Sequence, residues 1–280
     1  MEQQDVVYGA WRVQLKIDRV IDRRKGDHHD ILIFENRLFG RVLALDGIVQ
    51  TTERDEFVFH EMIAHVPLFA LAAPRDVLII GGGDGGALRR VLQHPSVARV
   101  HIAEIDSGVI ACSREHLPAI CGKAFDDPRC TIIVADGVDY IAGTKRRFDT
   151  ILIDATDPVG PGAALVHAAF YRNCRDRLTE GGVLVTQHGV PFAEPDWLAR
   201  PFARIGDAFA HTRCYLASVP ANYGGFLAFT MASDSAGAFD VTMPELRRRH
   251  ANASVTPRYY TPDIHQAAFA LPPYLTEIIA

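Results

Sequence analysis

Four acidic side chains stand at or just after the ends of four apolar stretches: Asp84, Glu104, Asp136 and Asp154. Gathered carboxylates attract cationic groups such as sulfonium and alkylammonium ions. An alkylammonium with a pKa of about 10.4 is not nucleophilic until it loses a proton, and a nearby carboxylate can accept that proton. The pattern therefore predicts a site for small cationic ligands, with chemistry on an amine.

A glycine-rich loop follows the first of these stretches. Gly81, Gly83 and Gly86 have G-x-G-x-x-G spacing, directly after a predicted strand over 76–80 and before a predicted helix. Glycines in this position allow the turn and let a ligand approach the backbone. Nicotinamide, flavin and S-adenosyl ligands all use such loops, and a tight structural turn is the alternative.

Asp84 lies inside this loop, where a dinucleotide would place its pyrophosphate. A carboxylate there repels phosphates but attracts a sulfonium. Asp84 thus favours an S-adenosyl compound over NAD, while an exposed turn residue or a helix cap is the alternative.

The next two strand patterns also end in acidic residues. Glu104 stands about twenty residues after the loop, where an acidic side chain can bind both ribose hydroxyls. Asp106 is a predicted helix cap, and Asp136 with Gly137 can meet an adenine amino group. Ligands of open α/β sheets bind outside the carboxyl ends of the strands, so we expect these residues to share one site.

Asp154 and Asp157 follow the fourth strand pattern and precede a Pro/Gly-rich loop. Two carboxylates at this spacing can hold a dication, and Asp154 is the predicted catalytic base. A turn with two capping side chains is the alternative.

Other familiar motifs are incomplete. His60, Glu61 and His65 miss the H-E-x-x-H metalloprotease pattern by one position, and there is no G-x-S-x-G elbow or Gly-Lys-Ser/Thr phosphate loop. The five cysteines include no C-x-x-C pair, which argues against a zinc ribbon or a disulfide framework. No metal is predicted, and residues 247–250 are interpreted as a solvated helix end.

The elements that must position these residues fall into two groups. Residues 11–52 alternate apolar and polar side chains, which predicts a small antiparallel sheet, and from Asp55 a period of about 3.6 predicts a helix ending near Pro74. From Asp76, apolar strands alternate with helices, the pattern of a doubly wound parallel α/β sheet. The predicted domains are 1–54, an N-terminal β-sheet domain, and 55–280, the catalytic domain.

The composition of the chain limits the kinds of binding partner and the location that are expected. With 48% hydrophobic and 22% charged residues the chain is typical of a globular protein, and a net charge of −5 makes nucleic acid an unfavourable partner. The longest uncharged run, 214–233, is broken by Pro220 and a glycine pair, so two antiparallel strands are predicted instead of a membrane span. The start, MEQQDVV, lacks an apolar segment, so a cytoplasmic location is expected.

These residues lie within longer stretches that resemble the bacterial spermidine synthases, aminopropyltransferases that use decarboxylated S-adenosylmethionine. The stretches that carry the resemblance are DILIFEN-x-x-FGRVLALDG-x-VQTTERDEF from Asp30, HEM-x-x-HVPL from His60, LIIGGGDGG from Leu78, EID-x-GV from Glu104, DDPR from Asp126, DATDPVGPG from Asp154 and RYYTPDIHQAAFALP from Arg258. They span nearly the whole chain.

The resemblance implies a Rossmann-like sheet of the S-adenosylmethionine-dependent methyltransferase type, a homodimer or homotetramer built through the N-terminal sheet, and a gating loop after Asp154. For the donor nucleoside it implies contacts from His29, Gly81, Gly83, Asp84, Gly86, Glu104, Asp136 and Gly137. For the acceptor amine, putrescine-like, it implies contacts from Gln50, Phe59, His60, Asp84, Asp154, Asp157, Gln187, Asn222 and Tyr223. In this scheme Asp84 holds the aminopropyl amine, Asp157 the far amine of the acceptor, and no metal takes part.

Three pocket positions depart from the family pattern. Phe59 and Asn222 stand where the family commonly has tyrosine, and His29 stands where a glutamine is expected; Tyr223 can fill the gap beside Asn222. Each lost phenol removes a hydrogen-bonding group worth about 1 kcal/mol. A protonated His29 could pair with the carboxylate of intact S-adenosylmethionine. An enzyme using that intact donor for aminocarboxypropyl transfer, cyclisation or methyl transfer is therefore the alternative, and a catalytically silent nucleotide-binding subunit is a third hypothesis.

Overall fold

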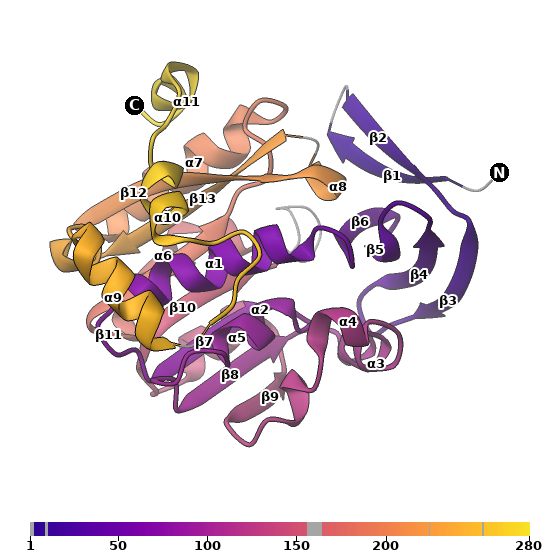
Figure 1. Cartoon of the computed structure of the whole chain (residues 1–280), viewed down its shortest axis with the longest axis horizontal. Coiled ribbons are helices and arrows are strands. Elements are labelled where there is room, and N and C mark those ends of the chain that lie inside the picture. The colour runs from indigo at the N-terminus through magenta and orange to yellow at the C-terminus, as the bar shows by residue number, and fades with distance from the viewer. Residues whose placement is uncertain (1–2, 9–10, 156–163, 224, 254) are drawn as a thin grey trace.

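The molecule contains two β-sheets with helices packed around them (Figure 1). One sheet is formed by residues before a long helix, and the other by residues after it. The computed structural model describes residues 3–8, 11–155, 164–223, 225–253 and 255–280. A six-stranded sheet precedes helix α1 (Glu56–Ala70), and a seven-stranded sheet follows it. The active-site candidates lie where these two parts meet.

The N-terminal sheet has the order β2-β1-β6-β5-β4-β3. Its strands are β1 (Gln3–Tyr8), β2 (Trp11–Lys16), β3 (Arg19–Lys25), β4 (Asp30–Asn36), β5 (Gly40–Leu45) and β6 (Ile48–Thr52). Strand β1 was not predicted, and it pairs in parallel with β6, with Asp5 opposite Ile48. The antiparallel sheet predicted over 11–52 is confirmed, because β3, β4, β5 and β6 pair antiparallel in turn. The polar start of β1 lacks the apolar alternation that marks a half-buried strand, so β1 gave no strand signal.

The seven-stranded sheet has the order β12-β13-β11-β10-β7-β8-β9. Five strands are parallel: β7 (Asp76–Gly81), β8 (Arg99–Glu104), β9 (Cys130–Val134), β10 (Phe148–Asp154) and β11 (Leu178–Gln187). β12 (His211–Val219) and β13 (Gly225–Ser233) add an antiparallel pair at one edge. This confirms the predicted doubly wound α/β class and the antiparallel pair in 214–233. No helix in the described ranges has the length and apolar character needed to cross a membrane.

Helices cover both faces of this sheet (Figure 1). After α1 they are α2 (Gly86–Val91), α3 (Ser107–His116), α4 (Pro118–Cys121), α5 (Gly137–Gly143), α6 (Ala168–Asp176), α7 (Pro195–Ala208), α8 (Pro220–Tyr223), α9 (Met243–Ala253), α10 (Pro262–Ala268) and α11 (Pro273–Ile278). The chain leaves β7 first toward β8 and then, on the other side, toward β10. The strand order therefore reverses beside β7, where α/β sheets open a crevice for ligands.

Helix α1 differs from its prediction in two ways. Every residue except Phe57 is buried, so the expected one-sided helix is wrong: α1 contacts the sheet on one side and α2 and α9 on others. It also ends at Ala70, because Leu71 is extended. Arg249 on α9 donates to the carbonyl oxygens of Phe69 and Ala70, at 2.9 and 2.8 Å, and so caps the end of α1. Arg249 is thus not merely part of a solvated helix end.

Asp106 connects the N-terminal sheet to the end of β8. Its carboxylate accepts the backbone N–H of Gly108, which confirms the predicted cap at the start of α3. The same carboxylate accepts the backbone N–H groups of Asp27, His28 and His29, at 3.1, 2.8 and 2.9 Å. The turn before β4 is therefore fixed against the strand end that carries Glu104.

Candidate active site

One cavity opens at the carboxyl ends of β7, β8 and β10, with the N-terminal sheet forming its other wall. Most of the residues predicted for donor and acceptor binding line it: His29, Gln50, Phe59, His60, Gly81, Gly83, Asp84, Glu104, Asp136, Gly137 and Asp154. Residues from separate strand ends thus meet in one place, as the sheet topology requires.

The glycine loop packs tightly under this cavity. Gly81 has φ +81°, and a Cβ on it would lie 2.2 Å from the carbonyl oxygen of Asp154. A Cβ on Gly86 would lie 2.1 Å from the His60 ring. Gly86 does not line the cavity; the absence of a side chain there makes room for His60 rather than for a ligand.

Glu104 is fixed by two backbone groups. Its Oε2 accepts the N–H of Gly83 at 3.0 Å, and its Oε1 accepts the N–H of Asp106 at 2.9 Å. Burial raises the pKa of Glu104, and these two donors counteract part of that rise. Each carboxylate oxygen keeps a second lone pair, so Glu104 can still accept hydrogen bonds from a vicinal diol.

Asp136 and Gly137 form the next part of the wall. The Asp136 carboxylate accepts the N–H of Val138 at 2.7 Å and so begins α5. A Cβ on Gly137 would lie 2.3 Å from Cγ2 of Ile80, so glycine permits the contact between α5 and β7.

His60 is fully buried between two carboxylates. Its Nδ1 lies 2.7 Å from Oε2 of Glu56, and its Nε2 lies 3.2 Å from Oδ2 of Asp84. Burial alone would lower the pKa of His60, but the charges and hydrogen bonds of Asp84 and Glu56 outweigh it and raise the pKa well above its usual value. His60 is therefore an imidazolium that donates from both ring nitrogens.

Sequence reasoning missed two members of this network. Glu56 lies on the wall of the cavity, and Arg90 donates to Oε1 of Glu56 at 2.7 Å. The signal that could have identified Glu56 is its i,i+4 spacing to His60 within one predicted helix. Arg90 lies on α2, and nothing in its local sequence indicates that it faces α1.

Asp84 both caps its loop and faces the cavity. Oδ1 accepts the N–H of Gly86 at 2.8 Å, while Oδ2 faces the His60 ring. Burial favours the protonated acid, but the neighbouring imidazolium reverses this and lowers the pKa of Asp84. Asp84 is thus a fixed negative charge in the wall of the cavity.

Asp154 ends β10 and has a different electrostatic environment. Burial and the negative charge of Asp84 raise the pKa of Asp154 to about 7. Its Oδ2 is buried and has no hydrogen-bond partner among the described residues. Ligand atoms of His60, Asp84 and Asp154 all lie within 4.8 Å of one another. Asp154 can therefore exchange a proton near neutral pH beside a fixed anion, as a general base requires.

His29 enters the cavity from the N-terminal sheet. Its Nδ1 lies 2.6 Å from Oδ2 of Asp46, a residue that sequence reasoning did not single out. Asp46 has φ +50° at the turn before β6, and its Oδ1 accepts the N–H of Asp30. The imidazole at position 29 is therefore paired with a carboxylate of its own sheet.

Besides Gly86, four predicted residues are not placed in the cavity wall. Gln187 is not part of the lining: its Nε2 donates to the carbonyl of Ala155 and its Oε1 accepts the N–H of Gly189, so the amide is used to hold the ends of β10 and β11 together. Asp157 and the predicted gating loop lie outside the described residues, as do the side chains of Asn222 and Tyr223 on α8.

Comparison with known proteins shows to which family the chain is similar. Residues 56–242 match the family model described as "Spermine/spermidine synthase domain", and residues 2–53 match "Spermidine synthase tetramerisation domain". A polyamine aminopropyltransferase of Klebsiella pneumoniae (strain 342) is 46% identical over 94% of this chain and 92% of that protein. Polyamine aminopropyltransferase 1 of Pseudomonas aeruginosa is 44% identical over 99% and 97%.

Solved structures agree with this assignment. A spermidine synthase in complex with the transition-state analogue AdoDATO superposes with a TM-score of 0.93 at 38% identity, covering 99% of this chain and 94% of that one. The spermidine synthase of Thermotoga maritima gives 0.92 at 38% identity, covering 100% and 94%.

The fold and the acidic cavity define an α/β transferase with its site at the sheet's carboxyl edge. The chain belongs to the spermine/spermidine synthase family, whose members are aminopropyltransferases.

Proposed function

We propose that the chain transfers the aminopropyl group of decarboxylated S-adenosylmethionine to a diamine such as putrescine. Asp154 carries the proposal: its unpartnered oxygen and its pKa of about 7 suit a base that takes a proton from an ammonium group. Asp84, held ionised by His60, supplies the anion that orients the aminopropyl ammonium.

The remaining lining residues position the nucleoside. Glu104 accepts hydrogen bonds from the ribose hydroxyls, and Asp136 with the backbone at Gly137 meets the adenine. The mostly apolar wall contributed by Leu43, Leu45 and other residues excludes water around the reacting atoms.

The reaction is an in-line displacement. The amine nitrogen, once its proton has passed to Asp154, attacks the carbon bonded to the sulfonium. The new C–N bond forms as the C–S bond breaks, and the electron pair stays on sulfur as neutral methylthioadenosine leaves. Because a sulfonium is already a good leaving group, positioning and deprotonation account for most of the catalysis.

The intact donor is disfavoured by the pairing of His29. The carboxylate of Asp46 already faces its imidazole at 2.6 Å, so the pair offers little net positive charge to a second carboxylate. The relatives named above also act in polyamine aminopropyl transfer.

A donor and acceptor panel tests the proposal. Purified chain is incubated with decarboxylated or intact S-adenosylmethionine and with putrescine, cadaverine or diaminopropane, and products are identified by mass spectrometry. Methylthioadenosine and a triamine formed only from the decarboxylated donor are expected. Turnover of the intact donor, or no turnover of either, would overturn the proposal.

We further propose that residues 1–54 form a separate β-sheet domain and that the chain assembles as a homotetramer through it. The match of residues 2–53 to a tetramerisation domain supports this. Light scattering of the purified chain should give four times the monomer mass of 30.9 kDa; a monomer mass would contradict it.

A further inference from the structure

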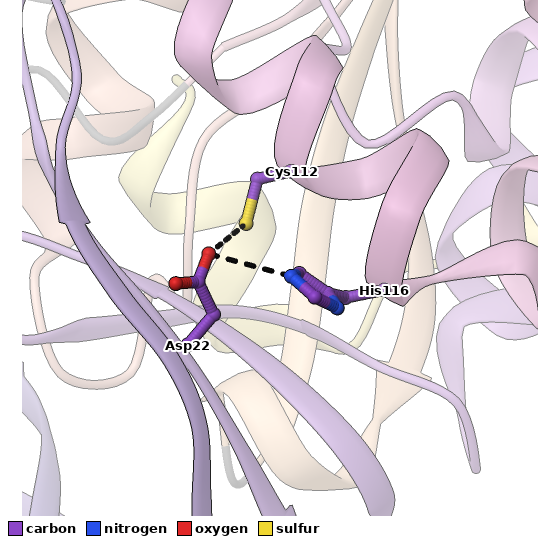
Figure 2. A group of neighbouring side chains, drawn as sticks. All are labelled: Asp22, Cys112 and His116. Atoms are coloured by element: carbon purple, nitrogen blue, oxygen red, sulfur yellow. Dashed lines mark hydrogen bonds and ion pairs between the residues drawn. The ribbon is translucent and has the colours of Figure 1, made fainter.

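A cluster of side chains with metal-binding chemistry lies apart from the catalytic cavity, where the N-terminal sheet meets α3. Asp22 projects from β3, while Cys112 and His116 project from α3 one helical turn apart (Figure 2). Neither Asp22 nor the two α3 residues line the cavity described above. Their role is not explained by aminopropyl transfer.

The spacing of the three ligand atoms suits one tetrahedral ion. Cys112 Sγ lies 3.5 Å from Asp22 Oδ2, and His116 Nε2 lies 3.4 Å from the same oxygen. Zinc bonds of about 2.3 Å to sulfur and about 2.0 Å to oxygen and nitrogen, at tetrahedral angles, separate S from O by about 3.5 Å and N from O by about 3.3 Å. The side chains are therefore already near the separations that a bound ion would impose.

Their chemistry also favours zinc over the hard cations. One thiolate, one imidazole and one carboxylate form a mixed donor set that zinc accepts, whereas Mg²⁺ and Ca²⁺ prefer oxygen alone. Glu115 Oε1 lies 3.5 Å from His116 Nε2, so a fourth ligand stands at the rim of the cluster.

A guanidinium now neutralises this cluster. Arg24 donates to Asp22 through Nε, and its Nη2 lies 3.1 Å from Glu115 Oε2 and 3.3 Å from His116 Nε2. The side chain of Arg24 is 34% exposed and those of Asp22 and His116 are 20% and 16% exposed. Arg24 can therefore swing out to water, and an ion can enter by the same side.

We propose that Asp22, Cys112 and His116 bind a Zn²⁺ ion that displaces the Arg24 guanidinium, with Glu115 or water as the fourth ligand. Binding forms the Zn–S bond and releases the Cys112 thiol proton to solvent.

The bound ion would act on stability, because it fastens β3 to α3. The first turn of α3 already holds the turn 27–29 through Asp106, and Arg24 joins β3 to the last turn of α3. The metal would replace the Arg24 hydrogen bonds there with coordinate bonds. We expect a higher melting temperature with zinc and an unchanged kcat.

Cobalt substitution tests the site directly. The full chain is stripped with a chelator, dialysed and titrated with Co²⁺, and the thiolate-to-cobalt charge-transfer absorption is recorded, followed by competition with Zn²⁺. One equivalent with that absorption is expected for the wild type. Cys112→Ser should abolish the absorption and weaken Zn²⁺ binding about 100-fold or more, whereas Cys130→Ser, at a partly exposed cysteine elsewhere, should change neither.

Two further variants test the zinc site without changing any of its proposed ligands. Arg24→Gln removes the competing cation and should tighten Zn²⁺ binding about tenfold even if Cys112→Ser folds poorly. Asp154→Asn disables the other described cluster that could hold an ion, His60 with Asp84 and Asp154, and should leave the cobalt spectrum unchanged. No charge-transfer absorption in the wild type, no tightening in Arg24→Gln, or loss of binding in Asp154→Asn would each overturn the site.

Discussion

Helix α1 carries two fully buried histidines, five residues apart, whose pKa values are shifted in opposite directions. His60 contacts Glu56 and Asp84, and these carboxylates raise its pKa well above the usual value in spite of burial. His65 contacts His94, with Nδ1 and Nε2 2.9 Å apart, and lies among the rings of Phe69 and Tyr260. Burial lowers the pKa of His65 well below the usual value, and the nearby basic groups lower it further.

The difference between the two histidines shows that carboxylate partners can outweigh burial at His60, whereas burial prevails at His65, where the neighbouring titratable groups are basic. A five-residue step rotates the side chain to another side of the helix, so the two rings meet different surroundings. Toward the catalytic cavity α1 presents His60, whose raised pKa favours the cation, and toward the core it presents His65, whose lowered pKa favours the neutral ring.

The largest effect is expected when Asp154, the proposed proton acceptor near His60, is replaced. Asp154→Asn keeps the shape but cannot take a proton, so kcat should fall about 10³-fold. In the wild type, kcat should rise about tenfold per pH unit up to the pKa of about 7 and then level off, because only the ionised carboxylate accepts the proton. The measurement is kcat from pH 5.5 to 9 at saturating acceptor; unchanged turnover, or the same inflection in the variant, would remove Asp154 from the mechanism.

Glu56→Gln removes one carboxylate beside His60 and so makes its surroundings more like those of His65. With one carboxylate gone, the pKa of His60 falls, and its positive charge no longer holds down the pKa of Asp154. The inflection in kcat should move to higher pH, and a shift of about one pKa unit should lower turnover at pH 7 about fivefold. Glu277→Gln, on an exposed part of α11, is the control and should leave the profile in place. An unshifted inflection would show that Glu56 has only a structural role.

Acid unfolding of the His94→Gln variant tests the other environment, that of the buried pair His65 and His94. Burial lowers the pKa of His94 to about 3, whereas the unfolded chain takes up that proton near pH 6.5, so the free energy of unfolding should fall as the pH falls below about 6.5. One such histidine contributes a slope of about 1.4 kcal/mol per pH unit, and the variant should lose that share. Denaturant titrations between pH 6.5 and 4.5 measure it. Exposed His28→Gln should keep the wild-type slope; equal slopes in His94→Gln and wild type would contradict the interpretation.

The smallest expected effect concerns Phe59, which lies next to His60 and lines the cavity. Phe59→Tyr supplies a hydroxyl toward the acceptor, worth about 1 kcal/mol, so KM for putrescine should fall about fivefold with little change in kcat. Steady-state kinetics with putrescine measures both. A raised KM would mean that the hydroxyl is left buried and unpaired.

The convergence of Asp84, Glu104, Asp136 and Asp154 could be predicted because a parallel sheet brings all its carboxyl ends to one edge. Asp46 could not be assigned in the same way, since its partner His29 lies outside its own turn and the sequence does not show how the two pack. Glu56 could have been assigned from its i,i+4 spacing to His60, but its pairing with Arg90 on α2 could not. Gln187 is predicted to line the pocket and does lie at the carboxyl end of β11, but its amide is bonded to the backbone of Ala155 and Gly189.

The helix that carries His60 is held at Glu61 and at its C-terminal end by residues that lie much later in the sequence. Glu61 accepts the backbone N–H groups of Arg258, Tyr259 and Tyr260, and Arg249 closes the carbonyl end. Arg258 lies 197 residues after Glu61, so the ribosome makes this helix long before the backbone groups that satisfy its buried carboxylate. The helix that carries His60 therefore reaches its final packing only after the segment around Arg258 has been made.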